Sequence, residues 1–283
     1  MIADVVICAR GGGLGHAARG IAAAEVLERD GREPLLLLRP GLDVEKLRMP
    51  GWLLKKTRFC SLSELSGVTG QALLVDTFPS GWRENISPTV LKRFDERILL
   101  ARYAEGASYA LVAEWFDAVL FPYSQTYSEW NLPPFSGIPI GFVIRPQPAF
   151  NQTPNGKLAF IDTEHRCQEG LLNQITEHAR VAGYELSVFF DLSREIYAEK
   201  FLFAGAGYNM FYEALERKLD ARFIPVEKRY DNQRKRADGF RLNLNGLPDL
   251  DRWLAFKSFP TFDIQICRTF TGDDAKRRQR YGS

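Results

Sequence analysis

The chain has 283 residues and a formal net charge of +2, with 45% hydrophobic and 25% charged residues. A usual domain has roughly 100–200 residues, so the length fits one large domain or two small ones. The balanced charge argues against nucleic acid as a partner and against an anionic membrane as the main one. No apolar run approaches the ~18 residues needed to cross a bilayer. The sequence starts directly with a strand-like run rather than a targeting segment, so we expect a cytoplasmic protein.

The four cysteines are scattered along the chain, at residues 8, 60, 167 and 267. Zinc sites and disulfide frameworks need closely paired or densely repeated cysteines. We therefore expect neither kind of site and place no metal in the predicted active centre.

The first half of the chain alternates between strand-like and helical runs. Residues 5–8 are apolar and β-branched, glycines follow, and residues 17–29 are rich in helix formers with apolar side chains on one face. Further elements are expected as strands at 34–38, 72–75, 97–101, 118–121 and 138–144 and helices at 88–94 and 105–116. Such alternation predicts a parallel sheet with right-handed crossovers.

A second alternation follows a stretch rich in proline, with residues 151–156 as the expected linker. Its elements are expected as strands at 157–161, 186–190, 201–203 and 221–225 and helices at 169–181, 210–217, 234–240 and 250–256. The sequence therefore predicts an α/β protein with two domains, at residues 1–150 and 151–283.

A glycine-rich loop, Arg-Gly-Gly-Gly-Leu-Gly-His at residues 10–16, lies between the first strand and its helix. Glycine lets the backbone approach a ligand closely, and the helix N-terminus presents N–H groups to an anion. This makes Gly12, Gly13 and Gly15 candidate ligand-binding residues. The loop lacks the Gly-Lys-Ser/Thr of a nucleoside-triphosphate-binding Walker loop. After the second strand, Arg39 occupies the position where a dinucleotide-binding motif has an acidic residue that binds ribose. Nicotinamide and flavin cofactors are therefore disfavoured.

Two titratable residues are expected at the carboxyl edge of the first sheet, where doubly wound folds bind ligands. His16 begins the first helix and could act as a general base because histidine titrates near neutrality. Asp76 ends a predicted strand and could itself accept the proton or orient the histidine. It could equally cap the turn before Pro79. The sequence leaves open which of the two is the base.

The second half carries a comparable loop at residues 203–215. Here Gly205, Gly207 and Asn209 open a predicted helix whose first turn could hold a phosphate through backbone N–H groups. Glu213 follows four residues after Asn209 on the same helix face and could accept two hydrogen bonds from a ribose diol. Arg229, in the next polar loop, could make a charge-assisted contact to a diphosphate.

These segments resemble the glycosyltransferases of GT-B fold, in particular family 28-like relatives of the peptidoglycan-precursor N-acetylglucosaminyltransferase. The resembling residues are 11–16 in the first half, and 205–209, Glu213 and the Asp231-Asn232-Gln233 run in the second. The resemblance implies two Rossmann-like domains facing a central cleft, with the acceptor mainly on the first and the nucleotide sugar mainly on a compact second domain. It implies phosphate contacts from Gly205, Gly207, Tyr208 and Asn209, a ribose ligand in Glu213, and sugar contacts from Asn232 and Gln233. Asp231, in the same run, is a further candidate substrate-binding residue.

The implied reaction is an inverting, metal-independent transfer of a sugar from a nucleoside-diphosphate sugar of UDP type to an unidentified acceptor hydroxyl, with no further cofactor. The chain is shorter than such enzymes usually are, and Asp162-Thr163-Glu164 replaces the glycine pair often found after the strand at 157–161. A nucleotide-sugar hydrolase of the same fold and a non-catalytic sugar-nucleotide-binding protein therefore stay open as alternatives. So does peripheral membrane contact through the aromatic and basic run at residues 52–56 or through Trp82.

Overall fold

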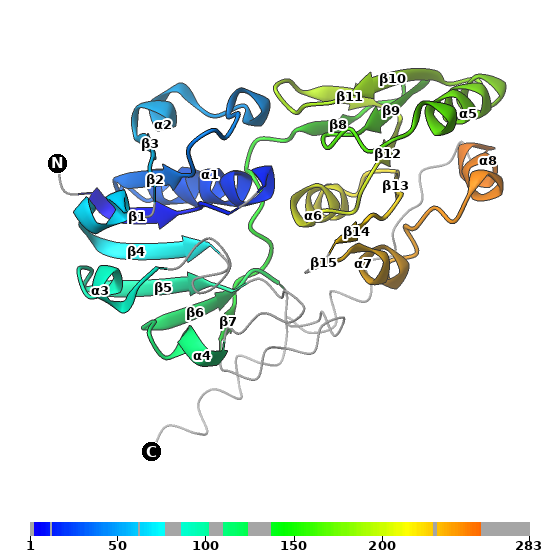
Figure 1. The fold of residues 1–283 in the computed structure, drawn as a ribbon. Coiled ribbons are helices and arrows are strands. Elements are labelled where there is room, and N and C mark those ends of the chain that lie inside the picture. The colour runs from blue at the N-terminus through cyan, green and yellow to red at the C-terminus, as the bar shows by residue number, and fades with distance from the viewer. Residues whose placement is uncertain are drawn as a thin grey trace, which may run out of the picture.

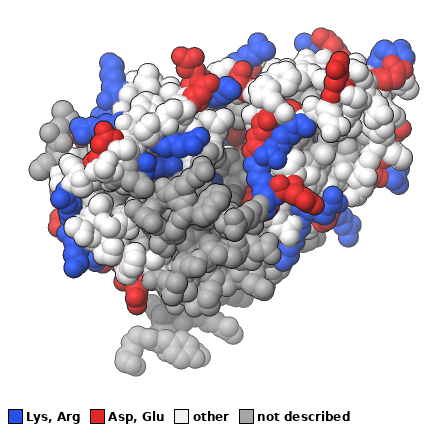
Figure 2. All heavy atoms as spheres, in the orientation of Figure 1, with Lys and Arg blue, Asp and Glu red and all other residues white. Residues whose placement is uncertain are grey.

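The structure is a computed structural model of the whole chain, and it describes residues 3–11, 13–61, 63–76, 86–101, 110–123, 137–228 and 231–255. Two α/β bodies lie side by side in Figure 1, joined by the extended connection at residues 140–149. Figure 2 shows basic and acidic side chains interspersed over the coloured part of one face of the molecule. No helix among the described residues is long and apolar enough to cross a membrane.

The first body is built on a seven-stranded parallel sheet with the order β3-β2-β1-β4-β5-β6-β7. Its strands are β1 (Ala3–Cys8), β2 (Pro34–Leu38), β3 (Thr57–Phe59), β4 (Gly70–Asp76), β5 (Glu96–Leu100), β6 (Ala118–Phe121) and β7 (Ile138–Pro139). The central strands β1 and β4 are apolar and buried along most of their length. Uninterrupted apolar runs of this kind form strands that are covered on both faces.

The described part of this body contains the α-helices α1 (Leu14–Arg29), α2 (Gly51–Lys55), α3 (Pro88–Leu91) and α4 (Ala110–Ala113), and the short 3₁₀ turns η1 (Glu45–Leu47) and η2 (Glu64–Gly67). Helix α1 packs closely on β1 and β2 through Gly20. A Cβ at this position would lie 2.6 Å from the Cβ of Ala9 and 2.8 Å from Cδ1 of Leu36. The absence of a side chain therefore seats α1 against the sheet and fixes where its first turn lies.

The strand order places a topological switch point between β1 and β4. From β1 the chain moves outward to β2 and β3, then returns to pair β4 with the other side of β1. Because parallel strands share one carboxyl edge, the loop after β1 and the last residue of β4 meet there. Those positions carry the glycine loop with His16, and Asp76.

The second body holds a four-stranded parallel sheet with the order β10-β9-β12-β13. Its strands are β9 (Lys157–Ile161), β10 (Glu185–Phe189), β12 (Lys200–Phe203) and β13 (Ala221–Phe223), and its helices are α5 (Glu169–Val181), α6 (Tyr208–Glu216), α7 (Gln233–Gly239) and α8 (Leu247–Ala255). Two small sheets complete it, the parallel pair β8 (Phe150–Gln152) and β11 (Ile196–Ala198), and the antiparallel pair β14 (Glu227–Lys228) and β15 (Asp231–Asn232).

Alternate residues of β9 enter two different cores. Leu158 and Phe160 join the buried cluster that includes residues of α5 and α8. Ala159 and Ile161 join a cluster that includes residues of α6 and also extends into the first body. This alternation is the period of two expected for a strand covered on both faces. The shared cluster means that the two bodies pack directly on each other.

The predicted α/β class, with two Rossmann-like domains, is confirmed. Several local predictions are wrong. The expected linker at 151–156 begins inside β8, whose residues 150–152 pair with β11. The expected strand at 138–144 ends at Pro139, after which the chain forms the connection between the bodies. Helix 105–116 is seen as α4 alone, and residues 102–109 lie outside the described part of the chain.

Candidate functional site

His16 and Asp76 lie in contact at the switch point of the first sheet. Nδ1 of His16 is 2.8 Å from Oδ2 of Asp76. His16 lies in the first turn of α1, and Asp76 is the last residue of β4. The side chain of His16 is 13% exposed and that of Asp76 only 1%. The imidazole therefore lies between a buried carboxylate and the outside of the domain.

The negative charge on Asp76 determines which ring nitrogen of His16 carries the hydrogen. Burial alone would raise the pKa of Asp76, but the guanidinium of Arg19 and the neighbouring His16 hold it well below its usual range. An ionised carboxylate only accepts hydrogen bonds, so Nδ1 of His16 must be the donor. In the neutral imidazole the lone pair then lies on Nε2.

Arg19 is the residue of this site that the sequence reading missed. It lies three residues after His16 in α1, and its side chain is 2% exposed. Nε donates to Oδ1 of Asp76 at 2.8 Å and Nη2 donates to Oδ2 at 2.9 Å. Burial lowers the pKa of Arg19, but Asp76 more than offsets this and the pKa is raised. The available signal was an arginine in the middle of a run of alanines and glycines, since the face around it packs on a sheet.

Nη2 of Arg19 also lies 3.3 Å from Nδ1 of His16. Both atoms are donors when His16 donates to Asp76, so this contact is a close approach of two N–H groups rather than a hydrogen bond. Arg19 and His16 thus share one carboxylate from adjacent directions. A proton added to His16 would place two cations beside each other.

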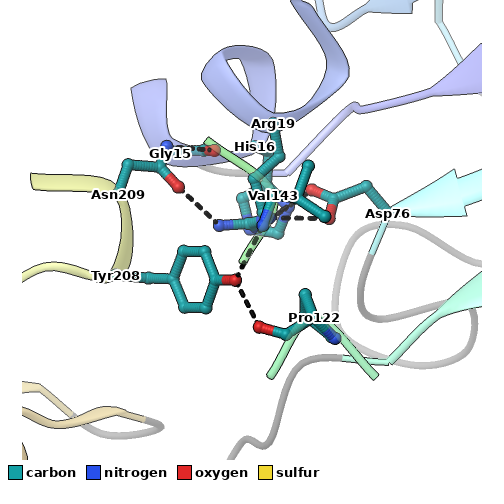
Figure 3. A network of polar contacts seen from close by, with 8 residues as sticks. All are labelled: Gly15, His16, Arg19, Asp76, Pro122, Val143, Tyr208 and Asn209. Atoms are coloured by element: carbon teal, nitrogen blue, oxygen red, sulfur yellow. Dashed lines mark hydrogen bonds and ion pairs between the residues drawn. The ribbon is translucent and has the colours of Figure 1, made fainter. Parts of the chain in front are cut away.

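The N-terminus of α6 in the second body contacts this group directly (Figure 3). Nδ2 of Asn209 donates to the carbonyl of Gly15 at 2.9 Å, and Nη1 of Arg19 donates to Oδ1 of Asn209 at 3.5 Å. The guanidinium of Arg19 also lies over the ring of Tyr208, 5.2 Å from its centre. The two glycine loops predicted from the sequence therefore meet in space.

Tyr208 is held by the first body and the connection. Its hydroxyl donates to the carbonyl of Pro122 at 2.5 Å and accepts from the N–H of Val143 at 3.4 Å. Burial raises the pKa of Tyr208, which keeps the phenol neutral. This side chain therefore fixes the start of α6 against the first body.

Buried side chains from β15 and α7 support the loop before α6. Oε1 of Gln233 accepts from the N–H groups of Ala206, at 2.7 Å, and Val226, at 3.2 Å. Asp231 pairs with the buried Arg236, whose Nη1 donates to the carbonyl of Ala206. Gln233 is 2% exposed and Asp231 9%. Both side chains thus shape the loop at 205–207.

Glycines begin both helices that meet at this point. The N-cap of α1 is Gly13 and that of α6 is Gly207, and neither end has a side-chain cap. By contrast, Asn232 caps α7 by accepting from the N–H of Lys235 at 3.0 Å. Gly205 has φ of +133°, a conformation that favours glycine. Gly12 and Arg229, also predicted to contact ligand, lie outside the described residues.

Glu213 lies within the domain junction. It is 6% exposed, and its Oε1 accepts from the N–H of Ala149 at 2.7 Å and from Nε of Arg217 at 3.3 Å. Burial raises its pKa. Its carboxylate therefore holds the connection between the bodies, and the ribose contact stays a prediction.

The loop after β9 is organised by a buried aspartate. Asp162, 1% exposed, accepts from the N–H groups of Arg166 and Cys167 at 3.0 and 2.8 Å. His165 lies on the surface and stacks on Phe190, with ring centres 4.7 Å apart. Its ring therefore packs against the residue that follows β10.

A hollow of about 560 Å³ lies beside the connection, lined by residues of the 144–152 segment and of α6 with the turn after it. Arg217, in its wall, donates to the carbonyls of Arg145 and Pro146 at 3.1 and 3.3 Å. Its wall is therefore part of the domain junction rather than of the His16 site. Within the described ranges, no group of three or more His, Cys, Asp and Glu side chains is placed to bind a metal ion.

Comparison with known proteins relates this chain to solved structures. No protein-family model matches the sequence, and no curated protein matches it at the sequence level. The spinosyn rhamnosyltransferase SpnG superposes with a TM-score of 0.53 at 13% identity, over 90% of each chain. MurG of Acinetobacter baumannii matches with a TM-score of 0.48 at 14% identity over 89% of this chain and 82% of its own. The glycosyltransferase SnogD from Streptomyces nogalater matches at 0.47 and 12% over 88% and 89%. The chain has the two-domain GT-B fold.

Proposed function

We propose that this protein is a glycosyltransferase that moves a sugar from a nucleoside-diphosphate sugar, of UDP type, to an acceptor hydroxyl. The observation that carries the proposal is the His16–Asp76 pair, 2.8 Å apart at the switch point of the first sheet, with the start of α6 docked against it. The fold shared with a rhamnosyltransferase supports the same class of reaction.

His16 is the general base in this proposal. The carboxylate of Asp76 already accepts from Nε and Nη2 of Arg19 and from Nδ1 of His16, so it is poorly suited to take up a proton. Instead it orients the imidazole and stabilises the imidazolium that forms. The acceptor hydroxyl gives its proton to Nε2 of His16, and its oxygen attacks the anomeric carbon. The bond from that carbon to the diphosphate oxygen breaks, and the configuration is inverted.

The leaving diphosphate takes the electron pair of the broken bond and needs positive potential. The uncapped first turns of α1 and α6 and the guanidinium of Arg19 lie around the same point. Helix N-termini bind phosphate through N–H groups and their dipole, and such fixed dipoles stabilise a developing negative charge. We therefore propose a metal-independent reaction in which Gly13, Gly15, Gly207 and Asn209 surround the leaving group.

Three residues receive different roles from those implied by the family resemblance. Gln233 and Asp231 support the phosphate loop from behind, and Glu213 holds the interdomain connection. Asn232 caps α7 through its side chain while remaining exposed, so a sugar contact stays a prediction for this residue. Gly12 and Arg229 likewise stay predicted ligand contacts.

The test is turnover of a panel of nucleoside-diphosphate sugars with and without a panel of hydroxyl acceptors. We expect nucleoside diphosphate release to depend on the acceptor, and His16→Ala to lower it by 10²–10⁴-fold, the usual contribution of general base catalysis. His178→Ala is the matched control, because His178 lies on α5 beside Asp251 in the second body. Rapid release of free sugar without acceptor would instead assign the chain as a hydrolase. Binding of nucleotide sugars without any turnover would assign it as a binding protein.

A further inference from the structure

Arg19 is the one residue in the described structure that contacts His16, Asp76 and the start of α6 together. Its Nε and Nη2 hold the two oxygens of Asp76, while Nη1 points across the domain junction to Asn209. Figure 3 shows this guanidinium between the carboxylate on one side and the second body on the other. Every nitrogen of the side chain is therefore directed to a group that the proposed reaction uses.

The geometry restricts how Arg19 can move. The planar guanidinium forms a rigid fork on Asp76, so any rotation that follows Asn209 also turns the carboxylate. Because Oδ2 of Asp76 accepts from both Nη2 of Arg19 and Nδ1 of His16, the carboxylate passes that rotation to the imidazole. The ring face of Tyr208, 5.2 Å from the guanidinium, bounds the same side.

We propose that Arg19 is a positioning residue that couples the contact between the two domains to the placement of the His16–Asp76 pair. In this arrangement Asn209, in the first turn of α6, contacts Arg19, so the position of the second body affects the orientation of the guanidinium. The guanidinium orients the carboxylate of Asp76, and the carboxylate orients the imidazole of His16. The base is then correctly oriented when the nucleotide-sugar side of the protein is in place. The catalytic meaning of this coupling rests on the glycosyltransferase function proposed above, whereas the coupling itself does not.

Nuclear magnetic resonance of the histidine side chains tests the coupling without turnover. The full chain contains three histidines, His16, His165 and His178, so long-range proton–nitrogen correlation of labelled protein gives a small set of signals. We expect the wild type to hold His16 in the tautomer with hydrogen on Nδ1. Arg19→Lys keeps the charge but loses the fork, and Asn209→Ala removes both contacts of that side chain across the junction, to Arg19 and to the carbonyl of Gly15. Both should shift the nitrogen signals of His16 and leave those of His165 and His178 in place.

Two control variants separate coupling from general destabilisation. Arg97→Lys breaks a similar bidentate pair with Asp117 in the first body, at 2.9 and 2.6 Å. Asn155→Ala removes an asparagine that bonds only within the second body, to Tyr197 and Lys157. Neither control should move the His16 signals. Unchanged His16 signals in folded Asn209→Ala would overturn the proposal, even if Arg19→Lys shifts them, because Arg19 would then serve Asp76 alone.

Kinetics provide the second measurement. Misplacing a reacting group by about 1 Å costs on the order of 10²-fold in rate, so Arg19→Lys should lower kcat by about that factor with little change in KM for the nucleotide sugar. Asn209 lies one step further from the base, so we expect Asn209→Ala to lower kcat by less than Arg19→Lys does, by about tenfold. A rise in KM at unchanged kcat in both variants would overturn the positioning role. If the wild type turns over no nucleotide sugar, the proposed function fails, and the resonance measurement still decides the coupling.

Discussion

Gly11 lies directly beneath the imidazole of His16. A Cβ built on Gly11 would be 2.0 Å from both Cγ and Cδ2 of the ring, far inside van der Waals contact. Real Cβ atoms do not approach other atoms so closely. A side chain on residue 11 would therefore push the imidazole ring out of this position. The glycine at this position therefore permits the ring to lie where its Nδ1 reaches Asp76.

We predict that Gly11→Ala displaces His16 and lowers kcat by about 10²-fold, because the base no longer lies in line with the acceptor hydroxyl. Steady-state kinetics and the nitrogen signals of His16 both check this. Gly51→Ala is the matched control, since a Cβ there meets nothing within 4 Å. Full activity in Gly11→Ala would show that the position of the ring is not what limits the reaction.

The low pKa of Asp76 makes part of the protein's stability depend on pH. A carboxyl group whose pKa is lower in the folded than in the unfolded chain stabilises the fold above its ordinary pKa, about 3.9. That contribution is lost as the pH falls below this value. We predict that the free energy of unfolding in urea falls as the pH is lowered from about 5 to about 2, and that the fall is smaller in Asp76→Asn.

The same variant should be less stable than the wild type at pH 7 by about 3–5 kcal/mol, since it leaves the buried Arg19 without a charged partner. Asp117→Asn is the control, because Asp117 pairs with Arg97 at the surface and its loss should matter little. An equal fall in stability on acidification in the wild type and in Asp76→Asn would place the pH dependence on other carboxyl groups.

Adjacency of His16 and Asp76 could be anticipated from the sequence. Alternating strands and helices predict a parallel sheet, and parallel strands bring the loop after one strand to the end of its neighbour. A residue that follows the first strand and one that ends a later strand are thus placed at one edge. The sequence pattern alone does not show that β1 and β4 are neighbours. Their pairing follows from the strand order of the sheet.

Arg19 and Glu213 could not be assigned in the same way. Arg19 becomes a buried partner of Asp76 only because Gly20 seats α1 so close to β1 and β2. Glu213 follows a glycine–asparagine helix start, a pattern that implies a ribose ligand, but the connection at residues 140–149 folds over it and brings Ala149 to its carboxylate. Local motifs specify which groups a helix carries. The long-range path of the chain decides which of them face inward.

Another buried ion pair, Lys200 with Asp220, lies at the amino-terminal edge of the second sheet. Nζ of Lys200 donates to Oδ2 of Asp220 at 2.5 Å, and Nε1 of Trp253 in α8 donates to Oδ1 at 2.6 Å. Lys200 is 1% exposed and Asp220 4%. We predict that Lys200→Met lowers the free energy of unfolding by about 3–5 kcal/mol, because it leaves a buried carboxylate without its cation.

Urea unfolding measures this loss, and activity at saturating substrate should persist wherever the variant is folded, since the pair is remote from His16. Lys157→Met is the control, since Lys157 on the neighbouring strand pairs with Glu185 at the surface, 3.9 Å away. If both variants are equally stable, α8 is held by apolar packing and the ion pair contributes nothing.

Glu213 gives the sharpest test between the role implied by sequence and the role implied by structure. As a support for the connection, Glu213→Gln should keep an oxygen acceptor for the N–H of Ala149 and change stability little. Glu213→Ala should leave that buried N–H without a partner and cost about 1–3 kcal/mol. Urea unfolding and calorimetric titration with UDP separate the two roles. We expect both variants to bind UDP as tightly as the wild type. A Glu213→Gln protein that is as stable as the wild type but binds UDP about tenfold more weakly, a difference of about 1.4 kcal/mol, would restore Glu213 as the ribose ligand.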